Sequence, residues 1–167
     1  KKKNDQEILE HSHNFMQLML NRRSIRDFSS KKVSDKVIEN ILKTAISSPS
    51  GANKQPWSFV VVKSKVLKKK IRIAAEQEEK KFYEQRATDE WLDDLNKFGT
   101  SWEKPFLEEA PALIIIFRQS YDNSGSKKRK NYYVNESVGI ASGFLLTAIQ
   151  NAGLVCLTHT PLSLIHI

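Results

Sequence analysis

The sequence contains a single cysteine, Cys156, among its 167 residues. One thiol excludes an internal disulfide framework and a cysteine-rich metal site. Cys156 stands in the apolar run Leu154–Leu157, where a small buried thiol is expected. The four histidines do not have metal-ligand spacing, and no Ser/His/Asp or Cys/His triad is apparent. The sequence therefore predicts neither a metal site nor a nucleophilic triad.

Long apolar runs are also missing. No run approaches the ~20 residues that span a bilayer, and Ala110–Phe117 fits a buried strand instead. No signal peptide is visible. The chain begins at Lys1 rather than at methionine, which leaves open an upstream anchor or targeting segment. We expect a cytoplasmic protein if the chain is bacterial, and a protein anchored through a missing N-terminal segment if it is animal.

Negative charge is the scarcer sign, since 27 Lys and Arg residues outnumber 19 Asp and Glu residues, for a net charge of +8. The basic residues are dispersed, apart from Lys68–Lys70 and Lys127–Lys130. Both clusters are interpreted as solvated surface, with attraction of an anionic cofactor or substrate as the alternative. No basic stripe alternates with aromatic residues, so no nucleic-acid partner is expected.

What is present is the composition of one globular domain, with 40% apolar and 28% charged residues. Apolar spacing and capping residues predict four helices: Glu7–Leu20, a helix that starts after Ser34 and ends before Pro49, Leu67–Arg86 and onward, and Val134–Ala152. Buried strands are predicted at Trp57–Val62, Ala110–Phe117 and Leu154–Thr158. Helices that alternate with short strands indicate an α+β fold with α/β-type layers. The last helix is apolar on most sides, which predicts burial, with a partner subunit as one candidate for the covering surface.

Two loops have residues suited to ligand binding. Arg22–Arg26 places three guanidiniums and the Ser24 hydroxyl between two helices, a plausible phosphate clamp. A basic helix end facing solvent is the alternative. Ser48–Trp57 contains Gly51, whose backbone can approach a planar ligand, and the amides of Asn53 and Gln55. A structural turn before a strand is the alternative there.

Two further groups are weaker on spacing alone. Glu79 and Tyr83 are four residues apart and share a helix face, and Lys104 follows beyond the helix. Together they could bind an ammonium and a carboxylate, although a solvated charged helix is the default interpretation. Thr158–Thr160 follows the third predicted strand, where hydroxyls often face a ligand. His159 alone is more typical of a structural histidine than of a catalyst.

Three segments together resemble the nitroreductase-like flavoprotein superfamily: RRSIRDF at Arg22–Phe28, SPSGANKQPWSFVVV at Ser48–Val62 and AIQNAGLVCLTHTPL at Ala148–Leu162. Within it, the chain is similar to the iodotyrosine deiodinase family, almost without gaps from about Asn21 to Pro161. The insertion Ile71–Ala110 resembles that family's active-site lid, which general nitroreductases lack. The family's lid triad of Glu, Tyr and Lys falls on Glu79, Tyr83 and Lys104.

The resemblance implies a nitroreductase-like fold, with a central mixed sheet flanked by helices, and FMN-dependent reductive dehalogenation of halogenated tyrosines. It assigns the FMN phosphate and ring edge to Arg22, Arg23, Ser24 and Arg26. Pro49, Ser50, Gly51 and Asn53 would line the flavin, and the Ala52 amide would donate to the substrate phenolate. Thr158, His159 and Thr160 would lie at the isoalloxazine, with one threonine bonding flavin N5 and both threonines assigned to catalysis. Glu79, Tyr83 and Lys104 would clamp the substrate zwitterion. The implied partners are a second subunit in a homodimer and NAD(P)H, acting through a reductase.

The last six residues, Leu162–Ile167, do not resemble the continuation of the family. They look like a translated sequencing adaptor, so we interpret 1–161 as the nitroreductase-like FMN domain, with its lid insertion at about 71–110, and 162–167 as a non-native tail. The family continues with a further flavin-phosphate arginine and a tail that embraces the partner subunit. We therefore expect the chain as written to have an incomplete flavin site and dimer interface.

Two alternatives remain open. A general nitroreductase or flavin reductase would share the arginine and proline motifs but would not need the lid triad. A non-catalytic or nucleic-acid-binding basic module would account for the net charge, but would bind no FMN. On the restored full-length protein, comparing turnover of diiodotyrosine with turnover of nitroaromatics distinguishes the first alternative. An FMN absorption spectrum of that protein argues against the second.

Overall fold

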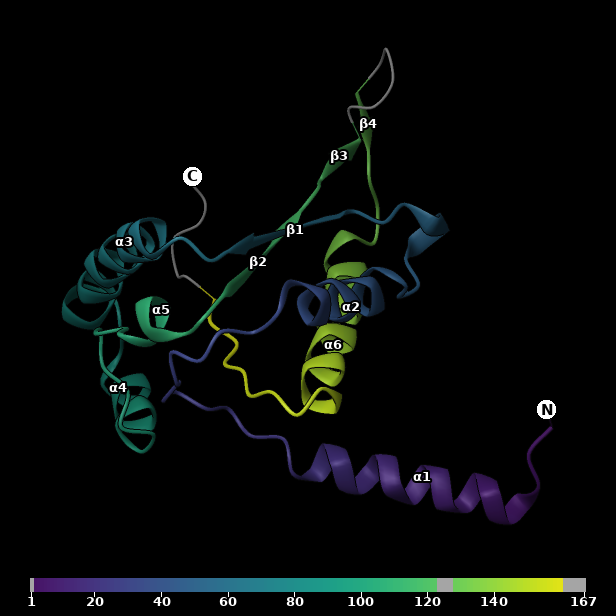
Figure 1. The fold of residues 1–167 in the computed structure, drawn as a ribbon. Coiled ribbons are helices and arrows are strands. Elements are labelled where there is room, and N and C mark those ends of the chain that lie inside the picture. Colours follow the sequence, from purple (N-terminus) through teal and green to yellow (C-terminus); the bar gives the residue numbers. More distant parts are fainter. Residues whose placement is uncertain (1, 123–127, 161–167) are drawn as a thin grey trace. The chain divides into compact units, whose positions relative to one another are not determined.

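The computed structural model describes residues 2–122 and 128–160, which fall into two compact units (Figure 1). The first unit contains Lys1–Ile25, Val33–Val60 and Ile116–Leu157. The second contains Arg26–Lys32, Val61–Ile115 and Thr158–Ile167. The predicted tail at 162–167 lies outside the described residues, as do Pro161 and Lys127. No helix in the described part of the chain is both long and apolar enough to cross a membrane.

The helices of the first unit are α1 (Asp5–Leu20), α2 (Asp35–Ile46) and α6 (Val134–Asn151). The predicted helices are confirmed to within a few residues. Ser34 caps α2 as expected, since its side chain accepts a hydrogen bond from the Val37 amide. A capping box begins α1, in which Asn4 and Glu7 each accept the other's backbone N–H at 2.9 Å. Gly153 ends α6 with a φ of 70°, a conformation that glycine adopts without steric cost.

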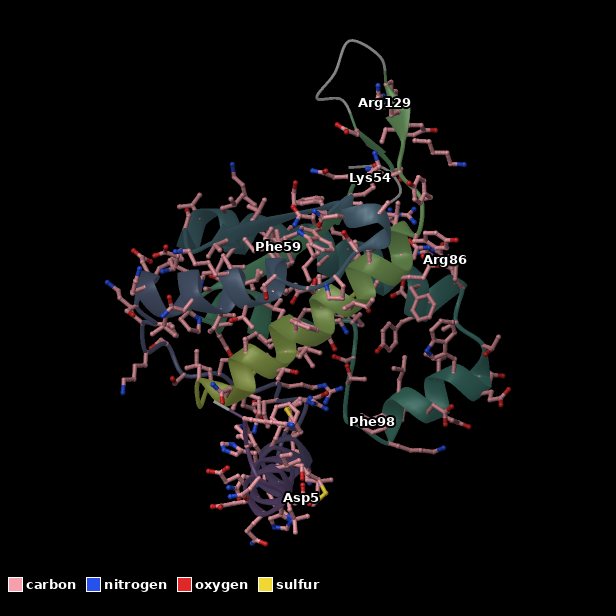
Figure 2. All side chains as sticks on the ribbon, turned by 90° about the vertical axis from the view of Figure 1, so that its right-hand side faces the viewer. Asp5, Lys54, Phe59, Arg86, Phe98 and Arg129 are labelled. Carbon is pink, nitrogen blue, oxygen red and sulfur yellow. The ribbon has the colours of Figure 1, made fainter. Side chains whose placement is uncertain are left out.

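The core of the first unit lies between α2 and α6, which pack against each other (Figure 1). The buried apolar residues of the two helices recur at helical spacing: Ile38, Ile41 and Ala45 on α2, and Ala141, Leu145 and Ile149 on α6. By contrast, no residue of α1 is buried, and its side chains project on every side, as Figure 2 shows near Asp5. The apolar residues of α1 are exposed, apart from Leu18 and Met19, which are half-buried.

Two of the three predicted strands are present, the first with its predicted bounds and the second starting three residues later and ending one residue later than predicted. β1 (Trp57–Val62) pairs with β2 (Leu113–Arg118), and this pair is all that the described residues show of the expected central sheet. A short antiparallel pair joins β3 (Tyr121–Asp122) to β4 (Arg129–Lys130).

The strand predicted at Leu154–Thr158 is wrong. The segment forms one isolated parallel bridge between Ser24 and Cys156, with the Ile25 amide donating to the Cys156 carbonyl at 3.2 Å. A strand requires consecutive partners along a ladder, which an apolar run by itself does not supply. Cys156 is also half-buried rather than buried, contrary to expectation.

The second unit contains α3 (Lys65–Gln85), α4 (Asp89–Asn96) and the short α5 (Phe106–Glu109). The long helix predicted from Leu67 ends at Gln85, because Thr88 caps a new helix through its bond with the Trp91 amide. The surface assignment of Lys68 is also wrong. Lys68 is 4% exposed, and its Nζ donates to the carbonyls of Glu108 at 2.8 Å and Ala110 at 2.6 Å. The ammonium thereby satisfies carbonyls at the end of α5.

Candidate functional site

The second unit brings the predicted lid triad together. Glu79 and Tyr83 lie one turn apart on α3, and Lys104 approaches from the segment before α5. Lys104 Nζ is 3.3 Å from Glu79 Oε2, and the two side chains are only 6% and 8% exposed. The same ammonium lies 5.6 Å from the centroid of the Tyr83 ring. Opposite charges buried this deeply require each other, because an unpaired charge in such a place is strongly unfavourable.

Tyr83 is held by a side-chain hydrogen bond with Thr100. Burial raises the pKa of the Tyr83 phenol, the neighbouring Glu79 carboxylate raises it further, and the bond with Thr100 opposes them. The phenol therefore stays protonated at neutral pH. A protonated phenol can donate a hydrogen bond to a ligand oxygen or accept one from a ligand ammonium.

His159 lies against this triad rather than apart from it. Its Nε2 is 3.8 Å from Glu79 Oε1, and its ring meets the Phe106 ring edge-on, with centroids 5.7 Å apart. That nitrogen is buried and has no hydrogen-bond partner among the described residues. Burial lowers the pKa of His159, Glu79 raises it and Lys104 lowers it, with a lowered pKa as the result. His159 is therefore neutral near pH 7, beside a carboxylate already paired with Lys104.

In the first unit, the loop before β1 has an unusual backbone. The 3₁₀ turn η1 (Gly51–Asn53) contains Ala52 and Asn53 at φ of 47° and 53°, and Gln55 follows at 46°. Left-handed conformations at residues other than glycine are strained and cluster at functional sites. The role of the Ala52 amide at a ligand stays a prediction.

Contacts with the start of α6 hold this loop. The Gly51 amide donates to Ser137 Oγ at 3.2 Å, and that hydroxyl donates to the Tyr133 carbonyl at 2.6 Å. A Cβ on Gly51 would lie 2.9 Å from Tyr133 Cδ2, so this position is restricted to glycine. Ser50 Oγ accepts from the Gln55 amide at 2.9 Å. Pro49, Ala52 and Asn53 are exposed. Sequence reasoning missed Tyr133 and Ser137, which had no motif to mark them.

The predicted phosphate-binding residues are exposed, apart from Arg22. Arg22 is half-buried, whereas Arg23 and Ser24 are exposed next to the bridge with Cys156. The Arg23 guanidinium donates to the Leu20 and Arg22 carbonyls. In the second unit, Arg26, Thr158 and Thr160 are also exposed. The cofactor-binding and catalytic roles of all these residues stay predictions, while the lid triad is a geometric cluster.

Sequence comparison matches residues 19–162 to the nitroreductase family. An iodotyrosine deiodinase from Haliscomenobacter hydrossis is 57% identical over 157 residues, which cover 93% of this chain and 71% of that protein. The iodotyrosine deiodinase of Hydra vulgaris is 49% identical, covering 95% of this chain and 59% of the relative. Human iodotyrosine deiodinase 1 is 46% identical, covering 95% and 55%. The chain thus spans little more than half the length of these animal relatives.

Solved structures give the same result. A crystal structure of oxidized iodotyrosine deiodinase bound to FMN and 3-iodo-L-tyrosine matches with a TM-score of 0.78 and 35% identity, covering 89% of this chain and 76% of that one. An FMN-dependent nitroreductase from Clostridium difficile matches with a TM-score of 0.58 and 30% identity, covering 85% and 58%. The predicted nitroreductase-like α+β fold is confirmed. The chain belongs to the nitroreductase family and, within it, to the iodotyrosine deiodinases.

Proposed function

We propose that the protein is an FMN-dependent oxidoreductase that removes halogen reductively from halogenated tyrosines. The observation that carries the proposal is the buried Glu79–Lys104 pair beside Tyr83, at the positions of the family's lid triad. Identities of 46–57% to proteins named iodotyrosine deiodinase support this activity over that of a general nitroreductase. The activity is proposed, since the chain covers only part of each relative.

We call Glu79, Tyr83 and Lys104 the clamp. Because Glu79 and Lys104 of the clamp pair with each other, a zwitterion is the preferred ligand. An amino acid's ammonium can take the place of Lys104 against Glu79, while its carboxylate takes the place of Glu79 against Lys104. Both buried charges then stay neutralised. A ligand with only one charge leaves the other side chain unpaired, which costs several kcal/mol when a buried pair is broken. Tyr83, which keeps its proton, can bond either end of the ligand.

The residues present fit FMN by their chemistry. The guanidiniums of Arg22 and Arg23 and the Ser24 hydroxyl suit a phosphate, and the glycine-containing turn at Gly51 suits a flat ring. When bound, FMN supplies the electrons that reduce the carbon–halogen bond, because side chains cannot. The strained Ala52 amide would donate to the substrate phenolate and hold the phenol ring in place. The lid would exclude water once a zwitterion is bound.

Replacing Glu79 tests this assignment. Glu79→Gln removes the charge that binds the substrate ammonium and leaves the predicted flavin contacts intact. We expect halotyrosine affinity to fall by at least about tenfold, roughly 1.4 kcal/mol, with FMN affinity unchanged. Glu84→Gln is the matched control, because Glu84 lies on the same helix in an exposed pair with Lys80. Titration measures the affinities of each variant for diiodotyrosine and for FMN. Equal loss of both ligands in Glu79→Gln would reject the clamp.

The partners are part of the proposal. The exposed apolar residues of α1 and α6, including Phe15 and Phe144, support a homodimer in which a second copy covers them. We propose NAD(P)H, acting through a reductase, as the source of electrons, because each turnover consumes two.

A further inference from the structure

The polar face of α3 extends beyond the triad. Lys68, Arg72, Glu76, Glu79 and Tyr83 follow one another at intervals of four, four, three and four residues, which places them along one side of the helix. Glu79 and Tyr83 are accounted for by the clamp, and Lys68 holds the end of α5. Arg72 and Glu76 have no part in the proposed chemistry, yet they are ordered by several contacts.

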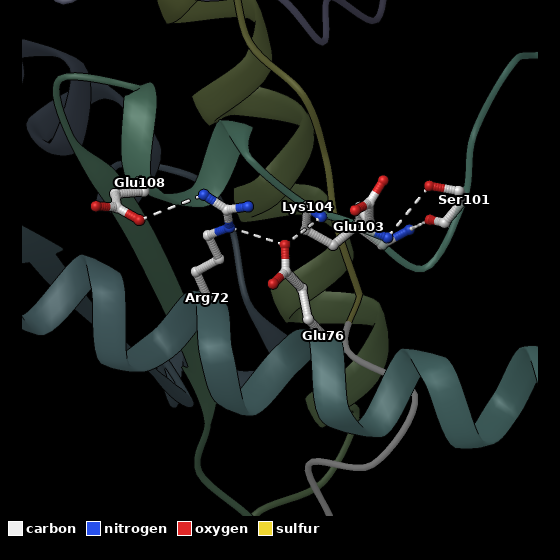
Figure 3. A network of polar contacts seen from close by, with 6 residues as sticks. All are labelled: Arg72, Glu76, Ser101, Glu103, Lys104 and Glu108. Atoms are coloured by element: carbon white, nitrogen blue, oxygen red, sulfur yellow. Dashed lines mark hydrogen bonds and ion pairs between the residues drawn. The ribbon is translucent and has the colours of Figure 1, made fainter.

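Glu76 binds the backbone of the clamp lysine (Figure 3). Its Oε1 accepts the Lys104 amide proton at 2.7 Å, and the same oxygen accepts from Arg72 Nε at 2.8 Å. Arg72 Nη1 reaches Glu108 Oε2 at 3.4 Å. Arg72 thus binds two carboxylates. The Glu76 side chain is 16% exposed, whereas the Glu108 side chain is 35% exposed. A backbone bond to a carboxylate is among the stronger hydrogen bonds, because the acceptor is ionised.

Lys104 is consequently held at both ends by one helix. Glu76 binds its amide, and Glu79 binds its ammonium three residues further along α3. The substrate carboxylate must bind the Lys104 ammonium, whereas the contact between Glu76 and the Lys104 amide can stay unchanged when substrate binds. A fixed backbone lowers the entropy lost when the flexible lysine side chain takes up a carboxylate.

We propose that Glu76, held by Arg72, is a positioning residue that fixes Lys104 for recognition of the substrate carboxylate. The inference rests on the proposed function, since it assigns Glu76 to the clamp of that site. Glu76 touches neither substrate nor cofactor in this scheme. It acts through the Lys104 backbone.

The acidity of Glu76 agrees with this arrangement. Burial raises its pKa, but the bonds from Arg72 and from the Lys104 amide lower it more, so the pKa is below its usual value. The carboxylate therefore stays ionised, and the anchor stays intact, throughout the neutral range. The groups that face it are Arg72 and Lys104, with Glu108 beyond Arg72.

The first test needs no cofactor. Hydrogen exchange of the Lys104 amide reports the Glu76 bond directly. In Glu76→Ala we expect the protection of this amide to fall by about tenfold or more, the equivalent of losing one hydrogen bond of about 1.4 kcal/mol. Glu76→Gln should keep most of the protection, because an amide oxygen still accepts. Glu84→Ala, on the same helix, should leave it unchanged. Unaltered protection in Glu76→Ala would overturn the proposal.

The second test uses the FMN-loaded protein with two ligands. Iodotyrosine has the zwitterion, and 2-iodophenol presents a similar ring without it. Glu76→Ala should weaken iodotyrosine by roughly tenfold and leave 2-iodophenol and FMN within about twofold of wild type. Equal weakening of iodotyrosine and 2-iodophenol would mean a general structural role and would overturn the positioning role. A full-length, FMN-loaded wild-type protein that does not bind iodotyrosine would overturn the proposed function, whereas wild-type binding with an unaffected Glu76→Ala would overturn this inference alone.

Discussion

At the scale of single residues, burial decides what a charged or titratable side chain does. Lys68 and Lys69 are neighbours in one basic cluster, yet Lys68 is buried against two carbonyls and Lys69 is exposed. His159 likewise has an ordinary sequence context, but it lies beside the buried Glu79 carboxylate. Residue type alone did not separate these cases, because the difference arises from contacts made by segments distant in the sequence.

His159 should make stability depend on pH. Its pKa lies below the ordinary 6.5, so on acidification through that value the unfolded chain takes up a proton that the folded chain does not. The free energy of unfolding should therefore fall as the pH drops below about 6.5 and stay level above it. Denaturant unfolding at a series of pH values measures this slope. His159→Gln should flatten it, whereas His13→Gln, exposed on α1, should not. An unchanged slope in His159→Gln would contradict the assignment.

At the scale of elements, the segments best predicted were those with strong local signals. Ser34 and Gly153 bound α2 and α6 where capping rules place them. Strands were predicted less well, since Leu154–Thr158 has the composition of a strand but makes only one bridge. The loop at Gly51 was predicted in part. Its glycine indicated close approach, but the structure shows that Tyr133 is what approaches.

Gly51→Ala should therefore disturb the candidate flavin loop. The added Cβ would lie 2.9 Å from Tyr133 Cδ2 and 3.0 Å from Tyr133 Cβ, which forces the loop or the start of α6 to shift. We expect a loss of roughly 1–3 kcal/mol in unfolding free energy and weaker FMN binding. Gly143→Ala is the matched control, because a Cβ there meets nothing within 4 Å, and it should be neutral or stabilising. Urea unfolding compares the two variants, and similar losses in both would refute the steric explanation.

At the scale of the whole molecule, the uncovered apolar surface of the first unit is the main feature. Leu9 is 63% exposed and Leu20 58% on α1, while Ile140 is 43% and Phe144 39% on α6. The sequence predicted that α6 would be buried, with a partner subunit as one candidate for the covering surface. Among the residues described, only the side of α6 that carries Ser137, Ala141, Leu145 and Ile149 is buried. The remaining side supports the proposed homodimer.

Phe144→Asp tests the homodimer. A carboxylate in the centre of an apolar interface would be desolvated without a partner, so the variant should shift the protein toward monomer by at least about tenfold in dissociation constant. Asn40→Asp, an exposed change on α2, should have no effect. Sedimentation equilibrium measures both variants. A full-length wild-type protein that is monomeric at every concentration, or a full-length Phe144→Asp variant that dimerises as tightly as wild type, would reject the role of this face.

The sequence by itself determined the three helices of the first unit, the ends of α2 and α6 at Ser34 and Gly153, the α+β class, and, through resemblance, the family and the three residues of the lid triad. These follow from local signals, or from motifs whose spacing is fixed along the chain. Only the tertiary structure decided that Glu79 and Lys104 neutralise each other, that His159 adjoins them, and that Glu76 binds the Lys104 backbone. Those contacts join residues 25 to 80 positions apart, and their energies depend on burial, which packing alone creates.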